Sequence, residues 1–260
     1  MRKIVAIGGG EIGRPGFPIE TLPIDKKIVG LSGKKSPRLL FLPTASSDSD
    51  GYIEVVKKYF GNKLGYKVGS LLLFNRSLLH EEIKTKILSS DIIYVGGGNT
   101  LKMMRRWRYL GVDKLLRKAY EKGIVMSGVS AGAVCWFNYA HSDSMSFYSP
   151  KKWSYIRVKC LNFVPFTLCP HYDGEKRDVH FKKMITKQGG IGIALDNCSA
   201  IEIIDDKYRI LTSKATAKAY VVYKRRGKVT QKEIEKKEEL VPLTQISKLC
   251  ELKDPNFRLL

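Results

Sequence analysis

Hydrophobic runs alternate with helical patterns through the first half of the chain. Five short apolar runs have the length of buried strands: residues 4–7, 38–44, 68–74, 92–95 and 123–126. Four segments between them place apolar residues at the three- and four-residue spacing of helices with one buried face: residues 52–64, 81–88, 101–109 and 113–122. This alternation predicts an α/β fold, in which a mostly parallel sheet is covered by helices on both faces.

The second half of the chain has a different pattern. Four strand-like runs follow with turn residues between several of them: residues 191–195, 200–204, 208–211 and 219–223. This pattern predicts antiparallel strands that extend the same sheet. No repeat, low-complexity tract or Gly/Ser linker divides the sequence, so we expect one domain over residues 1–260. Residues 224–260 are expected to form a basic, solvated and partly helical extension.

The composition indicates a folded protein with a large excess of positive charge. Of its 260 residues, 46 are Lys or Arg and 25 are Asp or Glu, so the formal net charge is +21, while 43% are hydrophobic. This apolar share excludes a disordered chain, and no uncharged apolar run approaches the roughly 20 residues that span a membrane. The basic residues are dispersed and accompany no nucleic-acid-binding motif, so a generally basic proteome or the attraction of an acidic substrate is the simpler explanation of the charge.

The cysteines and the N-terminal segment bear on the cellular compartment. The five cysteines are scattered and odd in number, and none forms a CxxC pair, so neither a disulfide framework nor a zinc site is expected. The first strand-like run begins at Ile4, which leaves no long apolar signal sequence before it. We therefore expect a cytoplasmic protein with reduced thiols.

A glycine-rich motif follows the first predicted strand. GGGEIG at residues 8–13 fits the G-x-G-x-x-G pattern of dinucleotide-binding loops, which requires a helix to begin at that point. The next residues, RPGFP at 14–18, cannot continue a helix. The motif therefore predicts a glycine-rich loop at the carboxyl edge of the sheet and argues against dinucleotide binding.

The strongest chemical motif is GVSAG at residues 128–132, which matches G-x-S-x-G. An apolar strand precedes it and a helix-compatible segment, residues 131–137, follows it. This context predicts a nucleophile elbow, a sharp strand-to-helix turn that presents Ser130 and needs small residues around it. The amide of Ala131 is then expected to be one oxyanion donor.

A nucleophilic serine needs a base, and the chain has four histidines. His171 follows a strand-like run at residues 163–168, so it is expected at the same sheet edge as Ser130 and is the preferred base. His141, close to the elbow in sequence, is the second choice. His80 and His180 lie in predicted surface helices.

The remaining members of the site are less sharply defined. Asp196, at the end of a predicted strand, and Asp143 are the two candidate acids. The Ser-His-acid order with Asp196 differs from that of α/β-hydrolases, which disfavours that fold. GGGNT at residues 96–100 is expected to supply the second oxyanion donor or a substrate contact, and Asn99 can also cap the following helix.

Three segments together resemble the peptidase E family of serine peptidases, which includes aspartyl dipeptidases and, more distantly, cyanophycinase. They are GGGNT at residues 96–100, SAGA at residues 130–133, and Pro-His at residues 170–171. The resemblance runs from the first strand to about residue 223 and implies a three-layer α/β/α fold similar to that of class I glutamine amidotransferases. It implies Ser130 as nucleophile, His171 as base, and the amides of Gly98 and Ala131 as the oxyanion hole.

The resemblance also implies a substrate. Aspartyl dipeptidases of this family remove an N-terminal aspartate and need a cation for its side chain, and Arg177 matches the arginine thought to provide it. The sequence departs from the family at the third triad position, where Asn197 can fall in the place of the acid. An asparagine can accept a hydrogen bond from the imidazole but stabilises the imidazolium less than a carboxylate does, which lowers the expected catalytic strength.

The expected function is hydrolysis of small peptides, in particular dipeptides with an N-terminal aspartate, through an acyl-enzyme. No metal or organic cofactor is required, and the protein is expected to be a monomer or a homodimer. The alternatives are an esterase, a cyanophycinase-like β-aspartyl peptidase, and a catalytically weak binding protein that retains the cleft.

Overall fold

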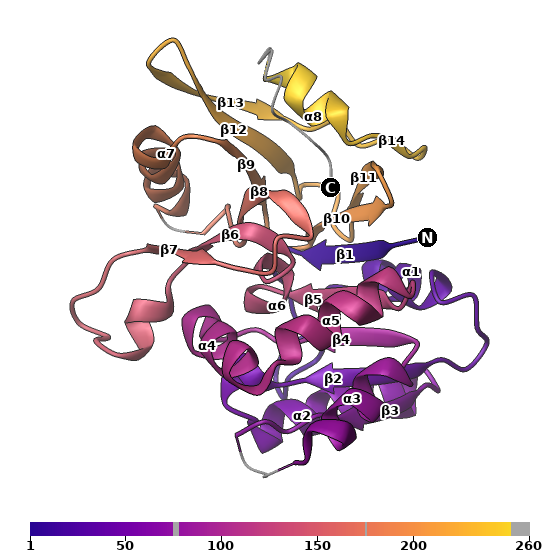
Figure 1. Ribbon diagram of the computed structural model, residues 1–260. Helices are drawn as coiled ribbons and strands as arrows, with labels where there is room; N and C mark the ends of the chain where they lie inside the picture. The colour runs from indigo at the N-terminus through magenta and orange to yellow at the C-terminus, as the bar shows by residue number, and fades with distance from the viewer. Residues whose placement is uncertain (75–77, 175, 251–260) are drawn as a thin grey trace.

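The computed structural model describes residues 1–74, 78–174 and 176–250, and its centre is an eight-stranded sheet with helices on both faces (Figure 1). Five strands of this sheet are parallel and lie in the order β1-β5-β4-β2-β3. Their bounds are Lys3–Ile7 (β1), Arg38–Leu42 (β2), Lys67–Ser70 (β3), Ile92–Val95 (β4) and Val125–Val129 (β5). The predicted mostly parallel α/β sheet is therefore confirmed.

The central strands are buried on both faces. On β1, Ile4 and Ala6 pack into one core, and Val5 and Ile7 pack into the other. Helices contribute to the first core from α3 (His80–Leu88), α4 (Thr100–Leu110) and α5 (Val112–Glu121), and to the second from α1 (Leu22–Gly30) and α2 (Asp50–Val56). Burial on both sides explains why these strands are continuous apolar runs.

A second sheet of six strands was not expected. Its order is β13-β12-β9-β8-β6-β7. The bounds are Phe137–Ser142 (β6), Ile156–Lys159 (β7), Val164–Cys169 (β8), Ile191–Leu195 (β9), Ala219–Arg225 (β12) and Lys228–Glu233 (β13). Helix α7 (Arg177–Gln188) packs on this sheet through Phe181 and Ile185.

The prediction that all the C-terminal strands extend the first sheet is wrong for β9 and β12, which belong to the second. It is right for β10 (Ser199–Ile204) and β11 (Lys207–Thr212), which add antiparallel strands beyond β1, followed by β14 (Val241–Pro242). A short apolar run predicts that a strand forms, but it does not predict which strand pairs with it. The chain enters the second sheet directly after the elbow, because α6 (Ala131–Val134) is only four residues long and β6 follows it.

The C-terminal segment is integrated into the fold as far as residue 250. Strand β13 pairs with β12, and α8 (Thr244–Leu249) buries Ile246. Leu243 and Cys250 are buried beside it. The expectation of a solvated tail is therefore wrong for β13, β14 and α8, which are integrated into the fold. It holds for residues 235–239, which are exposed.

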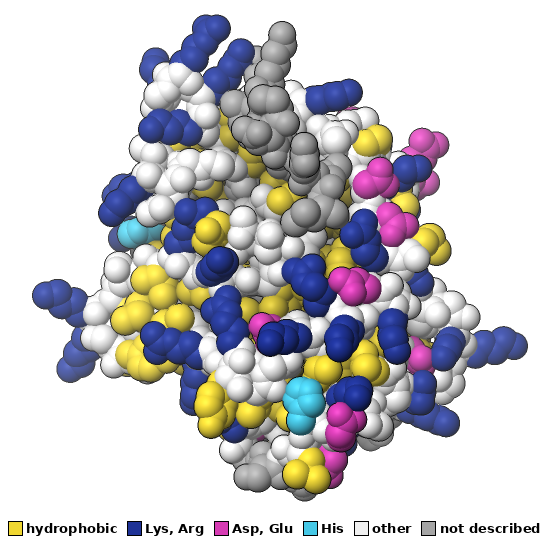
Figure 2. Space-filling view, viewed as in Figure 1, with side chains coloured by type: hydrophobic (Ala, Val, Ile, Leu, Met, Phe, Trp, Pro, Cys, Tyr) yellow, Lys and Arg dark blue, Asp and Glu magenta, His cyan; other side chains and the backbone are white. Residues whose placement is uncertain are grey.

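The glycine-rich segment after β1 is a loop, as expected, since no helix begins until Leu22. Figure 2 shows Lys and Arg side chains scattered over the viewed face, with acidic and apolar side chains between them. Within the described residues, no helix is long and apolar enough to cross a membrane.

Candidate active site

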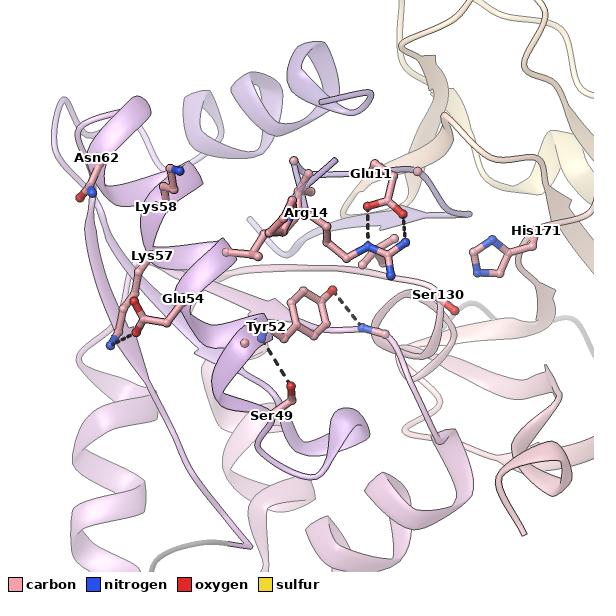
Figure 3. Close-up of a pocket in the computed structure, with 18 residues that line it drawn as sticks. Glu11, Arg14, Ser49, Tyr52, Glu54, Lys57, Lys58, Asn62, Ser130 and His171 are labelled. Atoms are coloured by element: carbon pink, nitrogen blue, oxygen red, sulfur yellow. Dashed lines mark hydrogen bonds and ion pairs between the residues drawn. The ribbon is translucent and has the colours of Figure 1, made fainter. Parts of the chain in front are cut away.

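A cleft of about 1140 Å³ opens at the carboxyl ends of the parallel strands (Figure 3). Its lining combines the glycine-rich loop after β1, the helix α2 with the π-helical turn that continues it (Lys57–Lys63), and the turns after β4 and β5. Ser130 and His171 lie at one end of the cleft. The two residues that sequence reasoning chose as nucleophile and base are thus brought to one place.

Ser130 occupies the tip of a strained turn. Its backbone has φ 56° and ψ −113°, a conformation that a residue with a side chain adopts only when its surroundings enforce it. The Ser130 N–H donates to the carbonyl of Ile7 at 3.0 Å, and Ala133 and Val134 donate back to the Ser130 carbonyl. A side chain at Gly132 would overlap the Val95 carbonyl. The small residues of the motif are therefore required by close backbone packing, as predicted for a nucleophile elbow.

The loop after β4 lies against the nucleophile. A Cβ built on Gly97 would be 3.4 Å from the Ser130 Cβ. Three amides of this loop are already bonded: Gly96 to the Leu42 carbonyl, Gly97 to the Tyr52 hydroxyl at 3.3 Å, and Asn99 to the Ala45 carbonyl. Within the described residues, the amides of Gly98 and Ala131 have no protein acceptor, so they are free to bind an oxyanion.

His171 follows β8 and joins the second sheet to the first. Its backbone has φ 48°, and its N–H donates to the Gly8 carbonyl at 3.1 Å. Burial lowers the pKa of the imidazole, which favours the neutral ring that a general base needs. Ser130 and His171 lie next to each other in the cleft without a hydrogen bond between them (Figure 3), and such bonds often tighten only when substrate binds.

The third position is occupied by Asn197. The His171 Nδ1 lies 2.7 Å from the Asn197 Oδ1, and the Asn197 Nδ2 donates to Asp173 at 2.9 Å. Because the amide nitrogen faces a carboxylate, the Oδ1 must accept from His171, so Nδ1 carries the proton and Nε2 is left free to take one. A side chain at Gly9 would overlap both the Asn197 Oδ1 and the imidazole, which requires glycine there.

Asp196, the first choice for the acid, does not contact His171. Its carboxylate accepts the Lys218 N–H at 3.0 Å, its own N–H donates to the Lys218 carbonyl, and burial raises its pKa. Both residues lie in the turn between β9 and β10, where Asp196 bonds to Lys218 and Asn197 bonds to His171 and Asp173. Asp173 was missed, although it lies two residues after His171. Its Oδ1 accepts both the backbone and the side-chain N–H of Asn197.

Asp143 and Arg177 bind each other away from the cleft. The Arg177 Nη2 donates to the Asp143 carboxylate at 3.0 Å, and the guanidinium lies over the Tyr155 ring. The Arg177 side chain is only 8% exposed and does not line the cleft. The structure therefore does not place Arg177 as a substrate contact, nor Asp143 as the partner of His171.

Asn99 is a helix cap. Its Oδ1 accepts the Lys102 N–H at 2.9 Å, and its Nδ2 donates to the Ser144 carbonyl at 3.3 Å. Both ends of the amide are therefore occupied, and the side chain is buried outside the cleft lining. The capping role considered from the sequence is the one observed.

The other histidines are not positioned as bases. His141 is buried in the second sheet, stacked on Tyr155 with ring centroids 4.3 Å apart, and burial lowers its pKa to about 3. His180 is half-buried beside the same ring, and His80 is exposed at the start of α3.

Glu11, Arg14 and Tyr52 are among the cleft residues that the sequence analysis did not identify. Glu11 and Arg14 lie in the loop of the glycine-rich motif, and nothing in that motif predicts that its charged side chains line a cleft. Tyr52 lies on an amphipathic helix, where its pattern resembles that of a core residue. Within the described residues, no group of three or more His, Cys, Asp or Glu side chains is arranged to hold a metal ion, and the five cysteines are free and buried.

Comparisons with known proteins agree with this geometry. Residues 4–211 match the family described as Peptidase family S51. The chain is 36% identical over 227 residues to the uncharacterized peptidase YgaJ of Bacillus subtilis strain 168, a match that covers 85% of this chain and 92% of that one. A match to peptidase E of Shewanella denitrificans strain OS217 is 27% identical and covers 56% of this chain and 59% of that one. The crystal structure of a peptidase from an acI-B1 actinobacterium superposes with a TM-score of 0.67 at 16% identity, covering 93% of this chain and 97% of that one.

Proposed function

Since the chain belongs to peptidase family S51, we propose that it hydrolyses short peptides, in particular dipeptides with an N-terminal aspartate, through an acyl-enzyme on Ser130. That the protein is a peptidase follows from its family. The proposed function is supported chiefly by Ser130 and His171, which lie together at one end of the cleft. The unbonded amides of Ala131 and Gly98 follow directly on Ser130 and on Gly97, which lies against Ser130.

The reaction begins with the neutral imidazole. His171 Nε2 takes the proton of the Ser130 hydroxyl as the Oγ attacks the scissile carbonyl carbon. The carbonyl oxygen becomes an oxyanion, which the amides of Gly98 and Ala131 stabilise. His171 then protonates the leaving amine, the C–N bond breaks, and a water activated by His171 releases the acyl group and restores the hydroxyl.

Asn197 and Asp173 orient the base. The amide of Asn197 fixes the ring and its tautomer through the 2.7 Å contact, and Asp173 fixes the amide. Because Asn197 has no charge, it stabilises the imidazolium less than a carboxylate would. This arrangement gives a weaker base than a Ser-His-Asp triad, but one that stays neutral to lower pH.

The proposal is tested by turnover of Asp-X dipeptides with wild-type protein and with Ser130→Ala, the released amino acid being followed by chromatography. We expect turnover by wild type and none by Ser130→Ala. Equal rates in both would remove Ser130 from the mechanism. Ester and β-aspartyl substrates in the same panel distinguish the esterase and cyanophycinase-like alternatives, and a protein that binds dipeptides without turnover would be the weak binding protein.

The proposed function also includes a domain organisation, a location and an oligomeric state. We infer one catalytic domain over residues 1–260, in which β13 adds an edge strand to the second sheet and β14 one to the first. A cytoplasmic location, a monomeric or homodimeric state and independence from nucleic acid accompany the proposal. Gel filtration, and a gel shift across ionic strength, test the last two.

A further inference from the structure

An ion pair lies in the cleft beside the reactive residues. The Arg14 Nε donates to the Glu11 Oε2 at 2.8 Å, and the Arg14 Nη2 donates to the other carboxylate oxygen. Figure 3 shows the pair between Tyr52 and His171, on the loop that crosses above Ser130. Both residues line the cleft. A guanidinium and a carboxylate are therefore available in the same cleft as Ser130 and His171.

The loop that carries the pair is fixed to the catalytic residues. The carbonyl of Gly8 accepts the His171 N–H, and the carbonyl of Gly9 accepts the Cys198 N–H at 2.8 Å. The carbonyl of Glu11 accepts the Glu20 N–H at 2.7 Å, and its own N–H donates to the Glu20 carboxylate at 3.1 Å. The backbone of Glu11 is thus held in place relative to His171.

The charged groups of a ligand can replace the partners of the Glu11–Arg14 ion pair. The Arg14 side chain is 58% exposed and that of Glu11 is 23% exposed, so their mutual attraction is weakened by solvent and adds little to stability. A ligand with an ammonium and a carboxylate a few bonds apart can replace each partner, so that no charge is left unpaired. A ligand with only one of the two charges leaves either Glu11 or Arg14 without its partner.

The other cations near the cleft are less suited to this role. Arg177 is buried against Asp143 outside the lining. Lys57 pairs with Glu54, and both Lys57 and Lys58 lie toward the end of the cleft opposite Ser130 (Figure 3). Arg14 is therefore the lining cation that lies next to the reactive serine.

We propose that Glu11 and Arg14 form the subsite for the N-terminal residue of the substrate, Glu11 binding its α-ammonium group and Arg14 its side-chain carboxylate. This inference rests on the proposed function and assigns the aspartate preference to residues other than Arg177. An N-terminal aspartate presents both charges on one residue, directly beside the scissile carbonyl. Arg14 contributes the fork of donors that matches a carboxylate.

The test combines substrates and variants. Wild type, Arg14→Ala, Arg14→Lys and Glu11→Gln are assayed for kcat/KM with Asp-Leu, Asn-Leu and N-acetyl-Asp-Leu. Wild type is expected to prefer Asp-Leu over Asn-Leu by about 10- to 150-fold, the range for one hydrogen bond to a charged group. Arg14→Ala should bring this preference to near unity, and Arg14→Lys should retain part of it. Glu11→Gln should abolish the preference for the free over the acetylated amino group. The control is Lys84→Ala, which removes an exposed ion pair on α3 outside the cleft and should change neither preference.

Two measurements separate failure of the subsite from failure of the function. Calorimetric binding of the same dipeptides to Ser130→Ala protein should show the same order, and it does not depend on turnover. A wild type that binds Asp-Leu selectively but hydrolyses nothing would refute the proposed function and support the subsite. An Arg14→Ala protein that keeps the wild-type preference, or that loses all three substrates equally, would overturn the subsite.

Discussion

Replacement of Asn197 by alanine tests the orientation of the base. The change removes the acceptor that lies 2.7 Å from the His171 Nδ1 and leaves the ring without a fixed tautomer. In the transition state this bond joins an imidazolium to an amide oxygen. Hydrogen bonds to charged groups contribute about 1.5–3 kcal/mol, so we expect Asn197→Ala to slow acylation of Ser130 by about 10- to 150-fold.

The assay is the second-order rate at which a fluorophosphonate modifies Ser130, followed by intact mass, because this step needs the base but no knowledge of the natural substrate. Asp196→Asn is the matched control. It retains an oxygen for the Lys218 N–H and removes only the charge, so its rate should equal that of wild type. A slow Asp196→Asn together with a normal Asn197→Ala would refute the assignment of the third position.

A double variant tests the same hydrogen-bond network by giving His171 a charged partner instead of removing its neutral one. Asn197→Asp alone would place a carboxylate against that of Asp173, because the two side chains are already bonded. Asn197→Asp combined with Asp173→Asn restores a donor facing an acceptor and gives His171 a charged partner. The pKa of His171 should then rise by about 1–2 units, and the acid limb of the rate profile should move to higher pH.

Three further outcomes are expected. Gly9→Ala should slow labelling at least as much as Asn197→Ala, because its Cβ would overlap the Asn197 Oδ1 and the His171 ring; a normal rate would show that the loop yields without cost. Burial lowers the pKa of His171, and only the neutral ring acts as a base, so the labelling rate should stay on its plateau down to a pH below the ordinary histidine pKa and fall only beneath it; a midpoint above pH 6.5 would contradict this. Burial raises the pKa of Asp25 to about 7, so ionisation of this carboxyl lowers the free energy of unfolding as pH rises from about 4 to 7. Measured by urea unfolding, Asp25→Asn should therefore be more stable than wild type at pH 8.5, by up to roughly 4 kcal/mol, and should differ little from it at pH 4.

The sequence predicted the parallel half of the fold because its strands are buried on both faces and its helices on one. These conditions produce the apolar runs and the helical spacing that were observed. The peptidase E resemblance drawn from three short segments is confirmed by the family match. The strand partners of β9 and β12 could not be predicted, since pairing depends on contacts between distant segments rather than on the apolar pattern of either strand.

In the candidate site too, residues within a local sequence motif could be predicted, and residues placed by contacts between distant segments could not. Ser130 was predictable because the elbow imposes small residues at fixed positions around it. Asp173, Tyr52 and Arg14 were not, because their places in the site depend on contacts between residues far apart in the sequence or on the shape of the cleft. Asp196 and Asn197 are neighbours, and only the direction of each side chain decides which of them meets His171.

The most direct measurement is peptide mapping of fluorophosphonate-treated wild type and His171→Ala. We expect one adduct on Ser130 in the wild-type protein and a loss of that adduct when the imidazole is removed. An unmodified Ser130 in wild type, or equal modification without His171, would contradict a serine activated by this histidine.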